Sequence, residues 1–297
     1  MNEKFPVPQA ERIIGSDKLS NKGTERLSEL SGRKKDEDSP IDIPTELQRV
    51  FKKSGEVIPR FEVKKTEKDR KIIMLAMESV KAFVRELGKK EFTDLPIENI
   101  HYLQKGGVRR SLKKGSTAVG SHSTVLGKVS VDRGGDLQTA ITTFHELWHA
   151  LASYHAVQVS TKGVVEPYRS GFGMKSRDGK KEWFHHIDEG LTGFMTKRFV
   201  EEVLEKHPDF KDLIEEKRAA GKEIDTTRQT EMDRTRRVAE VVWEKNKESL
   251  KDPEAVMTMF LRAQVTGNVL PIARLIEKTF GKGFFRHVGE KSQPKNS

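Results

Sequence analysis

The sequence contains no cysteine, which excludes a disulfide scaffold and any metal site that depends on thiolate ligands. It also lacks an uninterrupted apolar stretch approaching the ~20 residues of a membrane-spanning helix. Its first residues, Met-Asn-Glu-Lys-Phe-Pro, do not have the basic and then apolar build of a signal peptide. We therefore expect a soluble, cytoplasmic protein without membrane contacts.

Charged residues are abundant instead. Lysine and arginine number 55 against 45 acidic residues, so the 297-residue chain has a formal net charge of +10, and charged residues make up 34% of it. Globular proteins have about a quarter charged residues. The length allows one large domain or two small ones. The composition predicts a packed core surrounded by solvated or flexible segments.

The pattern along the chain divides it into four regions. The first region has few large apolar residues and a mixed-charge run, and this composition predicts a flexible segment. Its apolar cluster of Leu47, Val50 and Phe51 is a candidate for docking on the core and for regulating access to the site. The regions are a flexible N-terminal segment (1–62), an N-terminal subdomain (63–160), a C-terminal subdomain (161–288) and a tail (289–297).

The spacing of apolar residues predicts both helices and strands, and hence an α+β fold. Asp178-Gly179 favours a hairpin turn, and Asp252-Pro253 favours a helix start. The predicted strands are 97–103, 123–132 and the hairpin 168–176 with 181–187. The predicted helices are 66–87, 136–157, 188–206, 209–220, 226–248, 253–264 and 269–279.

One motif carries chemistry: His145-Glu146-Leu147-Trp148-His149 fits H-E-x-x-H within the helix predicted at 136–157. Helical positions i and i+4 lie about 40° apart, so both imidazoles can reach one metal ion. Glu146 borders that position without ligating the metal, and from there it can take a proton from a metal-activated water. The motif predicts His145 and His149 as zinc ligands and Glu146 as general base, against the alternative of a chance match with two ordinary histidines.

A third ligand is needed, and two residues are candidates. His155 has the spacing of the metzincin pattern H-E-x-x-H-x-x-G-x-x-H, but Ala152 occupies the glycine position. Because alanine favours a continuous helix, we expect His155 to lie about 9 Å along the axis from His149 and to serve as a core or interface residue. The other candidate is Glu189, which is also explained as an acid near a helix N-terminus.

The segment His186-Ile187-Asp188-Glu189-Gly190-Leu191-Thr192-Gly193, together with the H-E-x-x-H helix, resembles the gluzincins, and the layout of residues 67–288 is similar to that of the minigluzincins. The resemblance implies a zincin-like fold: a small sheet with the H-E-x-x-H helix, a hairpin, a glutamate helix and a helical C-terminal subdomain. It also implies that Glu189 is the third zinc ligand. Asp188 departs from the asparagine common in the aminopeptidases. Candidates for the family's transition-state-stabilising residue are Tyr168, His185 and His186.

These features lead to the hypothesis of a zinc-dependent metallopeptidase, an endopeptidase or oligopeptidase, that acts on a peptide or protein substrate. The strand at 125–131 would form the upper rim of its cleft. The rival hypothesis is a nucleic-acid or polyanion-binding protein, and it is based on the net charge and on a basic loop. Because this loop has no interleaved aromatic residues, nucleic acid is not the expected partner. A third is a zinc-bound but inactive scaffold, which would have no use for Glu146. The basic loop contains Lys105, Arg109, Arg110, Lys113 and Lys114.

Overall fold

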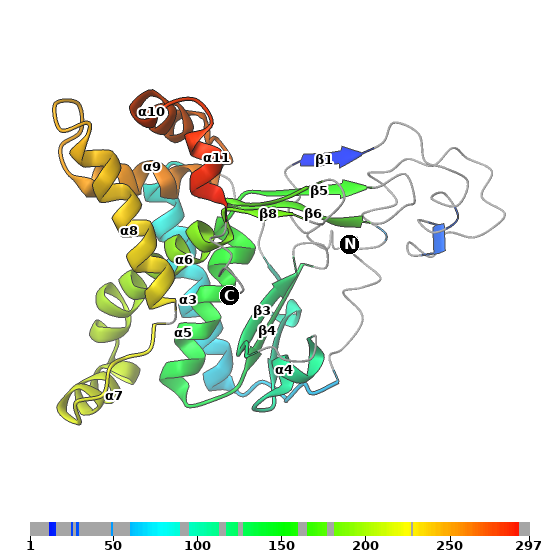
Figure 1. Ribbon diagram of the computed structural model, residues 1–297. Coiled ribbons are helices and arrows are strands. Elements are labelled where there is room, and N and C mark those ends of the chain that lie inside the picture. Colours follow the sequence, from blue (N-terminus) through cyan, green and yellow to red (C-terminus); the bar gives the residue numbers. More distant parts are fainter. Residues whose placement is uncertain are drawn as a thin grey trace, which may run out of the picture. The chain divides into compact units, whose positions relative to one another are not determined.

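The computed structural model describes residues 12–15, 25, 28–29, 49, 60–89, 95–112, 117–123, 127–159, 165–176, 181–226 and 228–290. It contains both helices and sheets, so the predicted α+β class is confirmed (Figure 1). No helix within these ranges combines the length and the apolar character that crossing a membrane would demand. The apolar cluster predicted at 47–51 lies outside the described residues, except for Arg49.

The chain forms two compact units. The first consists of Met1–Met77, Glu91–Leu151 and His155–Ser170, and the second of Glu78–Lys90, Ala152–Tyr154 and Gly171–Ser297.

In the first unit, a three-stranded sheet has the order β2 (Ile100–Leu103), β4 (Lys128–Asp132), β3 (Gly120–Ser123). Strand β2 runs parallel to β4, and β3 runs antiparallel to it. Helix α5 (Asp136–Leu147) packs against β3 and β4, as Figure 1 shows, and covers the buried Val129 and Val131. The strand predicted at 123–132 is therefore two strands, and the first residues of the strand predicted at 97–103 form the 3-10 helix η1 (Ile97–Asn99).

The helix predicted at 136–157 ends earlier than expected. After α5, one π-helical segment, η2 (Trp148–Ala152), leads directly into strand β5 (His155–Val159). Strand β5 pairs in parallel with β1 (Arg12–Gly15) and antiparallel with β6 (Val165–Ser170), and its Ala156 and Val157 are buried. Pairing with two strands satisfies the backbone of 155–159 without a helix, so tertiary context overrides the helix propensity of Ala152.

Helix α3 (Glu67–Glu86) follows its prediction closely. Thr66 and Asp69 cap its start reciprocally: the Thr66 amide donates to Asp69 Oδ2 at 2.7 Å, and the Asp69 amide donates to Thr66 Oγ1 at 3.2 Å. Gly88, with φ +95°, follows its C-terminus. The basic loop differs from its prediction, because part of it forms the short helix α4 (Gly107–Ser111), while Lys113 and Lys114 lie outside the described residues.

The second unit is mainly helical. Helix α6 (His185–Glu202) packs on α8 (Gln229–Glu244), which packs on α9 (Pro253–Thr266), and α10 (Leu270–Phe280) contacts α9 and α11 (Phe284–Gly289). Helices α6, α8, α9 and α10 bury an apolar core that includes Leu191, Val242, Phe260 and Ile276. Helix η3 (Leu204–Lys206) and α7 (Pro208–Ala219) complete the unit. The five predicted C-terminal helices are confirmed, and α11 was not predicted.

The predicted hairpin is shorter than expected. Strands β7 (Gly173–Lys175) and β8 (Glu182–Trp183) pair antiparallel, and the turn predicted at 177–180 lies outside the described residues. The strand predicted at 168–176 is interrupted at Gly171, which has φ +56°. Residues from His185 belong to α6 rather than to the second strand.

Candidate metal centre

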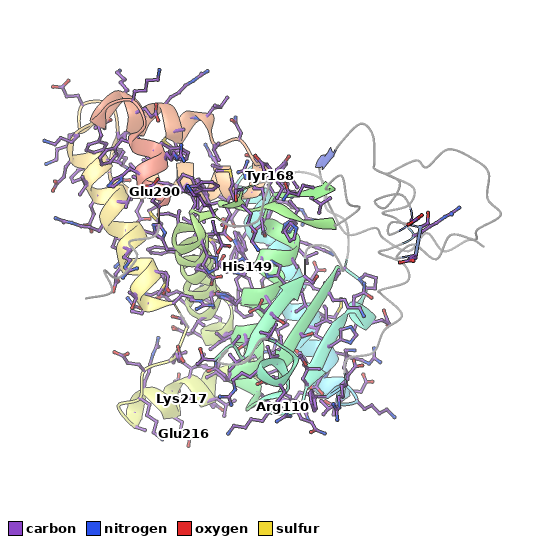
Figure 2. All side chains as sticks on the ribbon, turned by 45° about the vertical axis from the view of Figure 1, so that its right-hand side comes forward. Arg110, His149, Tyr168, Glu216, Lys217 and Glu290 are labelled. Atoms are coloured by element: carbon purple, nitrogen blue, oxygen red, sulfur yellow. The ribbon has the colours of Figure 1, made fainter. Side chains whose placement is uncertain are left out.

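The H-E-x-x-H motif lies at the end of α5 and in the first turn of η2. His145, Glu146 and His149 are all buried, with exposed fractions of 4%, 7% and 3%. The two imidazole rings meet edge to face, with centroids 5.0 Å apart. The helical spacing therefore places both histidines on one face, as the motif predicts. His149 is labelled in Figure 2.

Strand β3 approaches the carboxylate of Glu146 closely. A Cβ atom at Gly120 would lie 2.6 Å from Glu146 Oε1 and 2.8 Å from Thr142 Cγ2, so a larger residue does not fit without displacement. Burial raises the pKa of Glu146, but hydrogen bonding with His122 and the charges of His145, His149 and His122 outweigh it and lower the pKa below its usual value. The carboxylate therefore stays ionised near neutral pH.

His122, which was not predicted from the sequence, joins this cluster from β3. Its Nδ1 lies 3.6 Å from Glu146 Oε2. Its ring stacks on the ring of His149, with centroids 4.8 Å apart and planes inclined by 11°. A lone histidine in a short polar strand has no diagnostic spacing. The available signal was strand alternation, because Gly120 and His122 belong to one face of β3 and that face meets Glu146.

Glu189 lies in the first turns of α6 and is buried, with an exposed fraction of 8%. Its Oε2 forms an ion pair with Arg228 Nε at 2.7 Å, and its Oε1 lies 3.9 Å from His185 Nε2. The preceding Asp188 is also buried, and its Oδ1 accepts hydrogen bonds from the Phe172 amide and from Gln264 Nε2, both at 2.8 Å. These contacts fix the start of α6.

One potential ligand atom from each of His145, His149 and Glu189 lies within 4.8 Å of the others. Two imidazoles and one carboxylate are the donor set of many catalytic zinc sites, which leave a further position open. His155 is not a member of this group. It is buried on β5, where its Nε2 lies 3.3 Å from the carbonyl oxygen of Ala150.

The remaining candidate residues occupy other positions. Tyr168, labelled in Figure 2, is half-buried on β6, and His186 is half-buried in the first turn of α6. Their expected role in transition-state stabilisation stays a prediction. In the basic loop, the guanidinium of Arg110 lies 4.4 Å from the centroid of the Phe61 ring.

The buried His-His-Glu group next to an ionised carboxylate can hold a divalent metal ion and accept a proton beside it. Comparisons of the chain with protein-family models, with curated proteins and with solved structures find no match.

Proposed function

We propose that this protein is a zinc-dependent metallopeptidase of the gluzincin type, with a minigluzincin-like fold. The observation that carries the proposal is the buried group of His145, His149 and Glu189, whose ligand atoms lie within 4.8 Å of one another. Three nitrogen and oxygen donors suit zinc, and calcium or magnesium would instead require more oxygen ligands. We take Glu189 rather than His155 as the third ligand, because Glu189 belongs to this group and His155 does not.

Each residue then has a chemical task. His145, His149 and Glu189 would hold the zinc ion, which when bound supplies Lewis acidity and brings the pKa of a water molecule toward ~7. Glu146 would act as general base, because its buried carboxylate lies close enough to His145 and His149 for their charges to lower its pKa. After accepting the proton, Glu146 would donate it to the leaving amine of the cleaved peptide bond.

The substrate would be an extended peptide. The strand expected at the rim, 125–131, does not have this position, because its residues 128–131 belong to β4, which pairs with β2 on one side and β3 on the other. The edge strand beside Glu146 is instead β3, which pairs with β4 in the sheet β2-β4-β3. An edge strand offers unpaired amide and carbonyl groups, to which a peptide can add as a further strand. Because β3 also carries the residues that meet Glu146, a peptide bound there would pass the general base.

The test combines metal analysis with a peptide-library digest of the purified full chain. We expect one zinc ion per chain and peptide cleavage that stops with a chelator and returns with zinc. Glu146→Gln should keep the zinc and lose at least about 10²-fold in kcat, because the amide preserves shape but cannot accept the proton. Absence of stoichiometric zinc after reconstitution, or wild-type turnover in the Glu146→Gln variant, would contradict the proposal.

A further inference from the structure

His122 makes two different contacts with the proposed zinc site. Its Nδ1 faces Glu146 Oε2 at 3.6 Å, and its ring face covers the ring of His149 at a centroid distance of 4.8 Å. The side chain of His122 is 21% exposed, whereas that of Glu146 is 10% exposed. The side chain of His122 is therefore the more exposed of the two, and the carboxylate is the more enclosed.

The first contact bears on the general base. Glu146 is attached through a flexible side chain, and a base must point its oxygen at the proton that it removes. Gly120 leaves room for the carboxylate against the β3 backbone, and the Nδ1 of His122 lies beside the opposite oxygen, Oε2. An imidazole with its proton on Nδ1 attracts Oε2 across 3.6 Å, while Oε1 packs against the backbone at Gly120. The carboxylate is thus oriented from the same strand that approaches it.

The second contact bears on the metal ligand. A ligand histidine must present one ring nitrogen along a fixed direction, and neighbouring groups that fix the ring improve metal affinity. The His122 ring lies nearly parallel to that of His149, with planes inclined by 11°, so it limits rotation of the ligand ring about its Cβ–Cγ bond.

We propose that His122 is a positioning residue with two separable effects, one on the orientation of Glu146 through Nδ1 and one on the orientation of His149 through its ring face. This inference rests on the proposed function, because it takes Glu146 as the base and His149 as a zinc ligand. Asparagine places an amide nitrogen near the position of Nδ1 but has no ring. Phenylalanine keeps a ring face but has no donor.

The experiment therefore compares the variants His122→Asn, His122→Phe and His122→Ala, each made in the full chain. The readouts are kcat at saturating zinc, KM for a cleaved peptide, and the zinc dissociation constant from chelator competition. Ser130→Ala is the matched control, because Ser130 belongs to the same sheet but lies on the central strand β4, away from the edge strand to which the peptide would bind. Circular dichroism and thermal unfolding check that each variant folds.

We expect His122→Phe to bind zinc within about threefold of wild type but to lose about 10- to 100-fold in kcat with little change in KM. His122→Asn should keep kcat within about fivefold and weaken zinc binding about 10-fold, and His122→Ala should show both losses. Ser130→Ala should match wild type in all three readouts.

The opposite pattern would overturn the inference: wild-type kcat in His122→Phe removes the effect on Glu146, and wild-type zinc affinity in His122→Asn removes the effect on His149. A wild-type chain that binds zinc but cleaves no peptide would contradict the proposed function and, with it, the role of His122 toward a general base. In that case the zinc dissociation constants still decide the role of His122 toward His149.

Discussion

At the scale of single residues, the carboxylates of Glu146 and Glu189 are both buried but have different partners. Glu146 is surrounded by histidines, whereas Glu189 has the guanidinium of Arg228 at 2.7 Å. A permanently charged guanidinium stabilises an ionised carboxylate over the whole physiological pH range. One oxygen of Glu189 pairs with Arg228, and the carboxylate also contributes a potential ligand atom to the group that it forms with His145 and His149.

The choice of third ligand is testable by comparing Glu189→Ala with His155→Ala. We expect Glu189→Ala to weaken zinc binding by at least about 10²-fold, because one of three donors is lost. We expect His155→Ala to keep the zinc affinity, because His155 lies on β5 and is outside the His145-His149-Glu189 group. Chelator competition on folded protein measures both dissociation constants. Retention of zinc by Glu189→Ala together with its loss in His155→Ala would reassign the site to the metzincin pattern.

Because His101 is buried, we expect the stability of the protein to depend on pH independently of the metal centre. His101 is buried on β2, and its Nδ1 lies 2.9 Å from Glu62 Oε1. Burial lowers its pKa, and this effect outweighs the opposing hydrogen bond and charge of Glu62. The unfolded chain, with a histidine pKa near ~6.5, then binds a proton more readily than the folded chain. The contribution of His101 to the free energy of unfolding is therefore fully present above about pH 6.5. It is lost as the pH falls through the lower pKa that His101 has in the folded chain.

The measurement is urea unfolding between about pH 7.5 and pH 5.5 for the wild type and for His101→Asn. The wild type should lose more free energy of unfolding over this range than the variant, which has no imidazole to protonate. Parallel pH profiles for the two proteins would show that His101 does not titrate with a lowered pKa.

At the scale of elements, the packing of α6 against α8 depends on small residues. A Cβ atom at Gly190 would lie 2.5 Å from the carbonyl oxygen of Glu231 and would also meet the hydroxyl of Thr235. At Gly193, a Cβ would lie 2.8 Å from Met232 Cγ. Both glycines therefore present bare backbone to α8, one of them directly after Glu189.

Gly190→Ala should accordingly destabilise the protein by about 1–3 kcal/mol, because the new methyl group meets backbone that cannot move without shifting α8. Gly134→Ala is the control, since its φ lies outside the left-handed region and its Cβ would make only an ordinary contact, 4.0 Å from Gln138 Cβ. The control should stay within about 0.5 kcal/mol of wild type. Equal midpoints of urea unfolding for the two variants would argue against the close approach of α6 and α8.

Elements with strong local signals were predictable from the sequence. In α9, Asp252 accepts a hydrogen bond from the Ala255 amide at 2.9 Å, Pro253 begins the helix, and Gly267 ends it with φ +75°. The end of α5 was not predictable in this way. Whether residues 155–159 form a helix or a strand depends on pairing with β6 and with β1, and in the latter Arg12 pairs with Ala156, 156 − 12 = 144 positions later. No local pattern records such a pairing.

The residues of the candidate site likewise differ in whether a local sequence pattern indicates them. His145 and His149 were found from the geometry of one helix, because an i, i+4 spacing has a local meaning. Glu189 was indicated only by a family resemblance, since a separation of 189 − 149 = 40 residues carries no geometric information. His122 was missed, because its meeting with Glu146 depends on how α5 packs against β3.

At the scale of the whole molecule, β1 shows that residues close to the N-terminus contribute to the fold of the first unit. This strand lies within the segment 1–62 that was expected to be flexible, and it pairs in parallel with β5 over Arg12–Gly15. Closing so long a stretch of chain costs conformational entropy, so the pairing must gain enough from hydrogen bonding and burial to offset that cost.

Removal of residues 1–15 should therefore destabilise the protein and expose one edge of β5. Each backbone hydrogen bond contributes about 1 kcal/mol, and about 1 kcal/mol corresponds to roughly 2 °C in Tm for a chain of this size, so we expect a decrease of several degrees. An unpaired β5 edge also favours strand addition between molecules and hence aggregation on heating. A chain that lacks only residues 1–11 is the matched control, because it retains β1 and so isolates the contribution of residues 12–15. Calorimetry and light scattering compare the three proteins. Identical Tm values and identical scattering for all three would mean that the pairing of β1 with β5 contributes nothing to stability, and residues 1–15 would then be dispensable for the fold.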